Sequence, residues 1–372
     1  MKNNRTFLEK LLDGAEVEWK PLKDILIRTK GTKITAAEMK VLHKDNAPLK
    51  IFAGGKTFAL VNFEDIPEKD INKNPSIIVK SRGIIEFEYY DKPFSHKNEM
   101  WSYYSNDKNI NIKYIYYVLK NQEPYFQNLG SKMQMPQIAT PDTDKYLVPI
   151  PPLPVQTKIV KILDALTALT SELTSELILR RKQYEYYREK LLSFDSLEQL
   201  NMGGAKKKLI DVAKIKNGKD WKHLGEGNIP IYGSGGIMGY VDTYSYDKPT
   251  VLIPRKGTIT NIFYLDEPFW NVDTIYYTEI DENQILPKYF YHFMKTVDLT
   301  KLDTGSGRPS LTQAILNEIL IFVPPPEEQQ RIVSILDKFE TLTKSITEGL
   351  PLAIEQSQKR YEYYRELLLN FE

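Results

Sequence analysis

The chain contains the motif Ile150-Pro-Pro-Leu-Pro-Val-Gln-Thr-Lys-Ile-Val-Lys-Ile-Leu-Asp164 twice, the second time as Val323-Pro-Pro-Pro-Glu-Glu-Gln-Gln-Arg-Ile-Val-Ser-Ile-Leu-Asp337. Each copy is followed by the hexapeptide Tyr-Glu-Tyr-Tyr-Arg-Glu, at Tyr184–Glu189 and again at Tyr361–Glu366. An identity of this length, rich in tyrosine, indicates an internal duplication. The chain is therefore predicted to consist of two similar halves.

Both copies of the motif have the periodicity of a long amphipathic helix. Apolar residues recur at steps of three and four, which is the pattern of a coiled-coil seam. Paired prolines precede each helix, and proline is tolerated at a helix start. In the second copy, Gly349-Leu350-Pro351 predicts a kink or a restart near Ala353. The predicted seam residues are Ile159, Ile162, Leu166, Leu169 and Leu173 in the first helix and Ile332, Ile335, Phe339, Leu342 and Ile346 in the second.

The segments that precede the two helices also resemble each other. Pro75–Gly83 is similar to Pro249–Gly257, and Leu22–Ile25 is similar to Leu209–Val212. Runs of β-branched residues between Gly, Pro and Asn predict short strands and turns. We therefore expect mixed α/β, β-rich globular domains in two copies, separated by two long helices. The predicted bounds are 1–154 for the first globular domain, 155–194 for the first helix, 195–208 for a linker, 209–326 for the second globular domain and 327–372 for the second helix, kinked near 349–351.

Composition places limits on the class of protein. The 372 residues are 41% hydrophobic and 27% charged, which is typical of a globular chain. Because there is no cysteine, disulfides and thiolate metal sites are excluded, and a reducing compartment is expected. No apolar run approaches the ~20 residues that span a bilayer, so we expect a cytoplasmic protein. The net charge of +1 is low for a chain that binds nucleic acid alone, and would suit one whose partners share the phosphate contacts.

The duplicated motifs resemble the specificity subunits of type I restriction–modification enzymes, over nearly the whole chain. The features that carry the resemblance are the paired prolines followed by Gln156 and Gln329, the Ile-Val-x-Ile-Leu pattern, and the Tyr-Glu-Tyr-Tyr-Arg terminus. The segment Ile229–Gly239 is also similar to second recognition domains of that family. In the first copy, Val155 replaces the usual acidic residue, which Glu328 supplies in the second.

The resemblance implies a pseudo-twofold molecule in which an antiparallel helix pair separates two target-recognition domains. Each domain would read one half of an asymmetric, bipartite double-stranded DNA target with a fixed spacer. The helices would dock two methyltransferase subunits, and motor–nuclease restriction subunits would join them in the prokaryotic cytoplasm, on the nucleoid. The chain itself would be non-catalytic and hold no cofactor or metal, with S-adenosylmethionine, ATP and Mg²⁺ bound by the partners.

Candidate DNA contacts lie on loops at equivalent places in the two halves. Cationic side chains before a glycine turn can reach phosphates or guanine, and Arg, Gln, Ser and Thr on flexible loops can read base edges. Backbone amides in the turn around Ser234 could approach a phosphate. Plain solvated loops are the alternative for all of these segments. The candidates are Lys80, Arg82, Lys132, Gln134 and Gln137 in the first half and Ser234, Arg255, Lys256, Arg308, Ser310 and Thr312 in the second.

Two other classes of function remain as alternatives. A scaffold protein would use the helices and domains to bind proteins only, and its binding would lack the steep salt dependence of phosphate contacts. An enzyme would need a nucleotide, metal or carboxylate site. The four histidines are scattered, Asp303-Thr-Gly-Ser306 has no second copy, and the sequence contains no P-loop and no Asn/Asp-Pro-Pro-Tyr/Phe methyltransferase motif.

Overall fold

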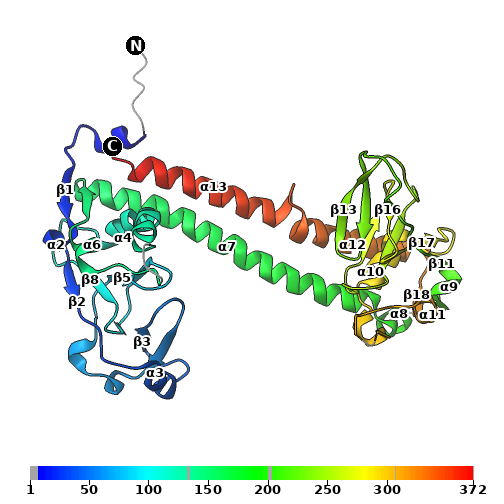
Figure 1. The fold of residues 1–372 in the computed structure, drawn as a ribbon, viewed down its shortest axis with the longest axis horizontal. Helices are drawn as coiled ribbons and strands as arrows, with labels where there is room; N and C mark the ends of the chain where they lie inside the picture. The colour runs from blue at the N-terminus through cyan, green and yellow to red at the C-terminus, as the bar shows by residue number, and fades with distance from the viewer. Residues whose placement is uncertain (1–6, 132–134, 200–202, 306, 372) are drawn as a thin grey trace, which may run out of the picture. The chain divides into compact units, whose positions relative to one another are not determined.

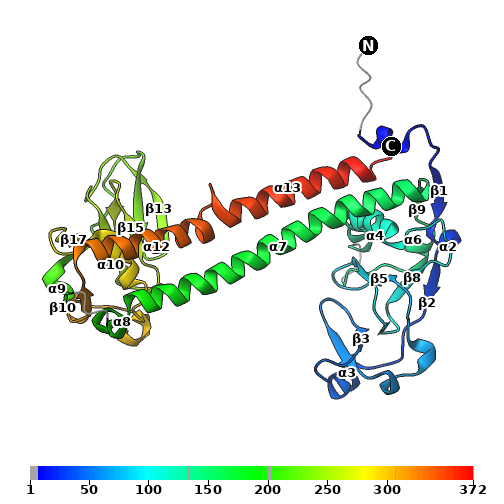
Figure 2. The same ribbon diagram turned by 180° about the vertical axis from the view of Figure 1, so that it is seen from behind.

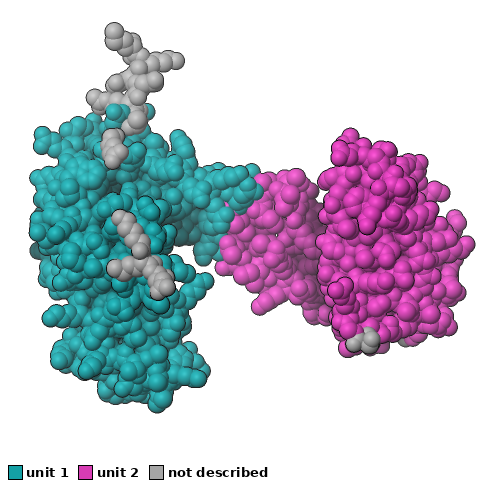
Figure 3. Space-filling view, viewed as in Figure 1, with its two compact units in different colours: residues 1–172, 355–372 teal, residues 173–354 magenta. Residues whose placement is uncertain are grey.

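The computed structural model describes residues 7–131, 135–199, 203–305 and 307–371, and divides into two compact units. Unit 1 comprises residues 1–172 and 355–372, and unit 2 comprises residues 173–354 (Figure 3). The boundary falls within the long helix α7 (Leu153–Leu192). The compact units therefore each include part of the helices that were predicted as separate segments.

Among its described residues, unit 1 contains three small sheets (Figure 1). One has four antiparallel strands in the order β2-β8-β5-β6. In the second, of order β4-β3-β7, the β3–β7 pair is parallel, and β1 and β9 form an antiparallel pair. The strands are β1 (Glu18–Pro21), β2 (Ile27–Thr29), β3 (Leu49–Phe52), β4 (Phe58–Val61), β5 (Ser76–Lys80), β6 (Glu86–Tyr90), β7 (Phe94–His96), β8 (Trp101–Tyr104) and β9 (Leu147–Ile150).

Unit 2 repeats this topology strand for strand. The order β11-β17-β14-β15 matches the four-stranded sheet, β13-β12-β16 again contains one parallel pair, and β10 pairs with β18. The predicted duplication of a mixed α/β domain is thereby confirmed. The strands are β10 (Ala205–Lys208), β11 (Ala213–Lys216), β12 (Ile229–Gly233), β13 (Gly236–Val241), β14 (Thr250–Pro254), β15 (Phe263–Leu265), β16 (Trp270–Asn271), β17 (Ile275–Ile280) and β18 (Leu320–Val323).

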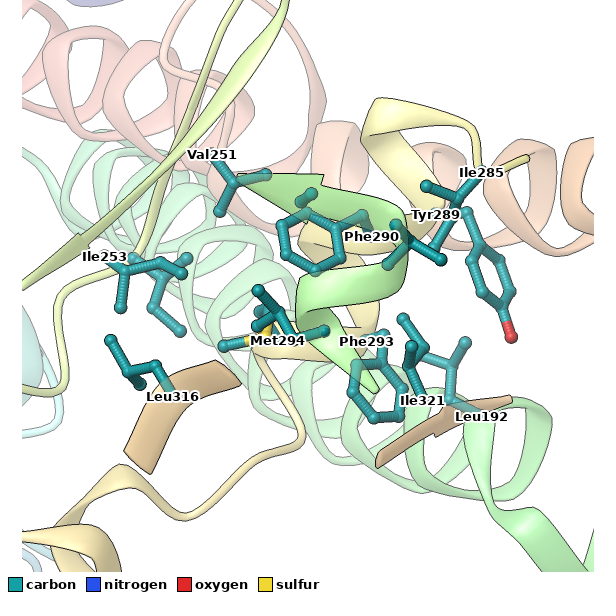
Figure 4. Packing of buried hydrophobic residues seen from close by; sticks show 14 of the residues in the cluster. Leu192, Val251, Ile253, Ile285, Tyr289, Phe290, Phe293, Met294, Leu316 and Ile321 are labelled. Atoms are coloured by element: carbon teal, nitrogen blue, oxygen red, sulfur yellow. The ribbon is translucent and has the colours of Figure 1, made fainter. Parts of the chain in front are cut away.

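Short helices cover the four-stranded sheet of each unit. In unit 1, α4 lies on β5 and β6, and Asn111 caps its first turn by accepting hydrogen bonds from two backbone amides. In unit 2, α10 takes the same place, and its Phe290, Phe293 and Met294 belong to the buried cluster that also contains Val251 of β14 (Figure 4). The short helices are α1 (Phe7–Leu12), α2 (Leu22–Ile25), α3 (Ala36–Leu42), α4 (Ile112–Asn121), α5 (Glu123–Gly130) and α6 (Thr140–Asp144) in unit 1 and α8 (Phe194–Gln199), α9 (Leu209–Val212), α10 (Pro287–Met294) and α11 (Gln313–Asn317) in unit 2.

Each unit contains an antiparallel helix pair. In unit 1, the start of α7 runs beside the end of α13 (Gly349–Leu369), as both ribbon views show (Figures 1 and 2), and Thr170 Oγ1 lies 2.8 Å from Ser357 Oγ. In unit 2, the end of α7 pairs with α12 (Pro326–Lys344). There the Tyr187 ring stacks on Phe339 at 5.7 Å, and Lys344 Nζ lies 5.5 Å from the Tyr184 ring. Later residues of α7 thus meet earlier residues of α12.

The buried stripe of these helices corrects part of the predicted seam. Ile159 and Ile332 are fully buried, but so are Leu163 and Leu336, which were not among the predicted seam residues. The helices contact both a partner helix and a globular domain, so their apolar face is broader than an a/d seam. Ile346 lies outside the helices and is 77% exposed, because α12 ends at Lys344.

Two predicted boundaries also differ from the structure. The second long helix stops at Lys344 and restarts at Gly349, a little before Ala353, near which the sequence predicted a kink or a restart. Gly349 has a φ of +82° and lies so near the Thr341 carbonyl that a Cβ would be 2.7 Å from its oxygen, so only glycine fits this break. The segment 195–208, predicted to be a linker, contains most of α8 and all of β10.

Candidate nucleic-acid interface

Two predicted loop segments of unit 1 are hydrogen-bonded to each other. Arg82 and Gln137 form an isolated antiparallel bridge. The Gly83 amide donates to the Pro136 carbonyl at 2.8 Å, and the Ile138 amide donates to the Ser81 carbonyl at 3.0 Å. Gly83 has a φ of +75°, which explains why glycine ends the basic turn. We refer to residues 81–84 and 135–138 as the unit 1 loop pair.

The equivalent segments of unit 2 meet in the same way. Lys256 and Ser310 form the bridge, the Gly257 amide donates to the Pro309 carbonyl at 3.0 Å, and the Leu311 amide donates to the Arg255 carbonyl at 2.8 Å. Residues 255–258 and 308–311 are the unit 2 loop pair. In each unit, segments about fifty residues apart in sequence thus form one surface feature that carries predicted DNA contacts.

The cations of the loop pairs differ in their exposure. Arg82, Lys256 and Arg308 are exposed, so their charges are available to a phosphate or a base edge. Arg255 is half-buried: its Nη1 donates to the Asp273 carbonyl at 3.4 Å, and its guanidinium lies 5.9 Å from the Tyr276 ring. This contact fixes the side chain of Arg255 at the edge of the loop pair.

Lys80 differs from the exposed cation that was predicted at this position. It is only 5% exposed, and its ammonium group is 2.5 Å from Glu86 and 2.8 Å from Glu88. Burial lowers the pKa of Lys80, but hydrogen bonds and attraction from these two carboxylates outweigh it and raise the pKa above its ordinary value. Because β5 and β6 pair Lys80 directly with Glu86, this charge is compensated within the domain.

Polar side chains beside the loop pairs have partly structural roles. Thr312 caps α11 by accepting a hydrogen bond from the Ile315 amide. The Ser310 amide donates to Asp303 Oδ1 at 2.8 Å, which orders the loop, and the hydrogen bonds from Ser310 and Gly305 hold the pKa of Asp303 below its ordinary value. Gln137 is half-buried, and Lys132 and Gln134 lie outside the described residues.

The turn between β12 and β13 lies against the unit 2 loop pair. The Ser234 amide donates to Thr274 Oγ1 at 3.3 Å, and Asn261 Nδ2 donates to the Ser234 carbonyl at 3.1 Å. A Cβ on Gly257 would be 3.1 Å from Ser234 Oγ, so the two segments are close neighbours. The structure therefore brings Ser234 together with Lys256. Asn261 and Thr274, which connect these segments, were not predicted from the sequence because neither belongs to a motif.

A buried glutamine anchors each long helix to its globular domain. Gln156 donates to the Pro151 carbonyl at 2.8 Å and accepts from the Asn111 amide at 2.9 Å. Gln329 repeats both contacts, with the Pro324 carbonyl at 2.8 Å and the Leu286 amide at 2.7 Å. These contacts explain why the same residue follows the prolines in both copies of the motif.

The aspartate that ends each motif is the second anchor. Asp164 accepts from Lys113 Nζ at 2.8 Å and from the Tyr117 hydroxyl, and Asp337 accepts from Lys288 Nζ at 2.7 Å and from His292 Nε2 at 2.8 Å. Burial raises the pKa of Asp337, but the hydrogen bonds from His292 and Lys288 outweigh it and hold the pKa below its ordinary value. Each long helix is thus held to α4 or α10 at a fixed position.

One group in unit 2 has the side chains of a metal site. Ligand atoms of His292, Asp337 and Glu340 lie within 4.8 Å of one another. However, Lys288 already neutralises Asp337, and Glu340 forms an ion pair with Lys344. Because both carboxylates are compensated by cations, we interpret the group as part of the helix anchor.

Comparison with known proteins identifies the family. A sequence model described as "Type I restriction modification DNA specificity domain" matches residues 15–180 and 203–356. The chain therefore belongs to the family of type I restriction–modification specificity subunits. No helix among the described residues is both long enough and apolar enough to cross a membrane.

Relatives match the chain from end to end. A protein of Haemophilus influenzae, named as a putative type I restriction enzyme specificity subunit, is 40% identical over 100% of both chains. The EcoR124I/EcoR124II specificity subunit of Escherichia coli is 34% identical over 98% of this chain and 97% of its own length. The crystal structure of an S subunit from M. genitalium shares the fold with a TM-score of 0.66 at 20% identity, over 97% of this chain and 98% of that one.

Proposed function

We propose that this chain reads a bipartite DNA sequence, one half-site with each unit, and directs the catalytic subunits of a type I restriction–modification complex to that site. The observation that carries the proposal is the repetition of the loop pair. Both units present the same hydrogen-bonded turn with an exposed cation, Arg82 in one and Lys256 in the other. The two loop pairs have the same backbone hydrogen bonds but different side chains, as expected of a protein that reads two different half-sites.

The long helix supports a fixed distance between the half-sites. Its 40 residues correspond to ~60 Å at 1.5 Å per residue, compared with ~34 Å for one turn of B-DNA. The anchors at Gln156 and Gln329 tie the helices to the domains that would read the bases. The spacer of the target would then be set by the helices and its sequence would remain unread.

The partners would supply all of the chemistry. We assign S-adenosylmethionine to two methyltransferase subunits that dock on the helix pair, and ATP with Mg²⁺ to motor–nuclease subunits. The same division of labour accounts for the low net charge of +1, because phosphate contacts would be shared with those subunits. In this scheme the chain binds, orients and measures the DNA, and is non-catalytic.

Methylation mapping tests the proposal directly. The chain is co-expressed with its methyltransferase subunit in a host that lacks adenine methylation, and modified adenines are located by sequencing. We expect a split motif with a constant spacer. A control strain lacking the specificity chain should show no modified motif. An intact complex that methylates no motif, or that binds DNA without salt dependence, would favour the scaffold alternative.

A further inference from the structure

The tips of the two loop pairs present opposite chemistry on the same backbone. In unit 1 the Gly83 amide donates to the Pro136 carbonyl, and Ile84 and Met135 are the next residues beyond this hydrogen bond on the two segments. In unit 2 the Gly257 amide donates to the Pro309 carbonyl, and Thr258 and Arg308 are the next residues beyond that hydrogen bond. The tip of the unit 1 loop pair thus carries two aliphatic side chains, whereas the tip of the unit 2 loop pair carries a hydroxyl group and a guanidinium group.

The aliphatic tip of unit 1 is unusually exposed. Ile84 is 66% exposed and Met135 is 64% exposed. Single exposed apolar residues are common, but here two large ones flank the same backbone hydrogen bond of one turn. This hydrogen bond from the Gly83 amide to the Pro136 carbonyl joins the two segments that carry Ile84 and Met135. The exposed cation Arg82 is two residues before Ile84. An apolar pair beside a cation fits a surface that meets a charged backbone and an apolar group together.

DNA offers one such apolar group on its base edges, the C5-methyl of thymine in the major groove. We propose that Ile84 and Met135 contact a thymine methyl group in the half-site read by unit 1, and so help to determine its sequence. This inference rests on the proposed function and specifies the chemistry of one of its two readers. Arg82 would neutralise a neighbouring phosphate, while the Thr258–Arg308 tip of unit 2 would recognise a polar base edge.

Deoxyuridine tests the contact because it pairs like thymidine and lacks only the methyl group. The complete methyltransferase complex is bound to duplexes carrying the mapped target, in which each thymine of both half-sites is replaced in turn, at one salt concentration. We expect replacement of at least one thymine to weaken binding about fourfold, the effect of losing one buried methyl group. In the double variant Ile84→Ala, Met135→Ala, the same replacement should have no further effect. The variant Val41→Ala is the control, since Val41 is 83% exposed in unit 1 and lies outside the loop pair, and it should retain the fourfold effect.

The outcomes separate this inference from the proposed function. A split motif in which every thymine tolerates deoxyuridine would overturn the inference and leave the proposed function intact. The inference is equally wrong if the fourfold effect persists in the double variant, or if the half-site read by unit 1 contains only G·C pairs. Side chains inserted between base steps in the minor groove would also be insensitive to the methyl group, and would count against the proposal.

Discussion

Replacing Gln329 by leucine should detach the second long helix from its globular domain. The amide of Gln329 makes three hydrogen bonds to backbone groups: Oε1 accepts from Leu286 N at 2.7 Å, and Nε2 donates to the carbonyls of Gln284 at 3.1 Å and Pro324 at 2.8 Å. Leucine fills a similar volume but leaves one N–H and two C=O groups, which are buried or partly buried, without these partners. At ~1–3 kcal/mol for each such group, the expected loss of unfolding free energy is about 3 to 9 kcal/mol.

The assay is urea unfolding followed by tryptophan fluorescence, since unit 2 contains Trp221 and Trp270. The control is Gln330→Leu, which changes the next residue of α12 at an exposed position and should alter stability by no more than ~0.5 kcal/mol. Equal losses in the two variants, or a loss below ~1 kcal/mol for Gln329→Leu, would refute the anchoring role.

Three further changes test other parts of the structure. Ile332→Ala should cost about 2–5 kcal/mol in thermal or urea unfolding because the side chain is fully buried, whereas Ile346→Ala, at an exposed position, should be nearly neutral. Asp337→Asn should cost about 2 kcal/mol at pH 7; because the folded pKa of Asp337 is lowered, this difference should be complete above its ordinary value of 3.8 and vanish as the pH falls through the lowered value in an acid titration of stability. Arg308→Ala should relax base preference at one position of a half-site by about 1–3 kcal/mol in competition binding, whereas Lys256→Gln should weaken binding to all sequences and reduce the salt slope by about one.

The repeated motif was sufficient to predict the duplication and the helices, but the predicted helical seam extended beyond the end of α12. Ile346 continues the spacing of three and four past the end of α12, but the chain has already left the helix at Ser345, whose ψ of 130° is extended. Leu163 and Leu336 are buried because each helix contacts a globular domain as well as a helix. Periodicity in a single helix indicates an apolar face, and does not say how many neighbours cover it.

The sequence predicted separate segments of the candidate interface, and did not predict that they lie together. The turn at Gly83 and the loop near Gln137 were both identified, but their mutual hydrogen bonds join segments far apart in sequence, which no local pattern indicates. The burial of Lys80 did have a local signal: Glu86 and Glu88 alternate on the paired strand, on the face that Lys80 shares. Two acidic residues at a spacing of two, opposite a lysine across a tight turn, indicate an ion pair within a hairpin.

The residues that anchor the helices are distinct from the exposed residues at the tips of the loop pairs. This separation would allow the proposed base preference of a unit to change while its fold is kept. The anchors, such as Gln329 and Asp337, are hydrogen-bonded in equivalent ways in both units, so replacing them costs stability. The tip residues Ile84, Met135 and Arg308 are exposed, and the turns beneath them are held by backbone hydrogen bonds that are independent of side-chain identity. Substitutions at the tips should therefore change stability by no more than ~0.5 kcal/mol while changing the chemistry presented to a base. If each unit reads one half-site as we propose, a substitution at a tip would change the bases that are read and leave unchanged the anchors that hold the long helices.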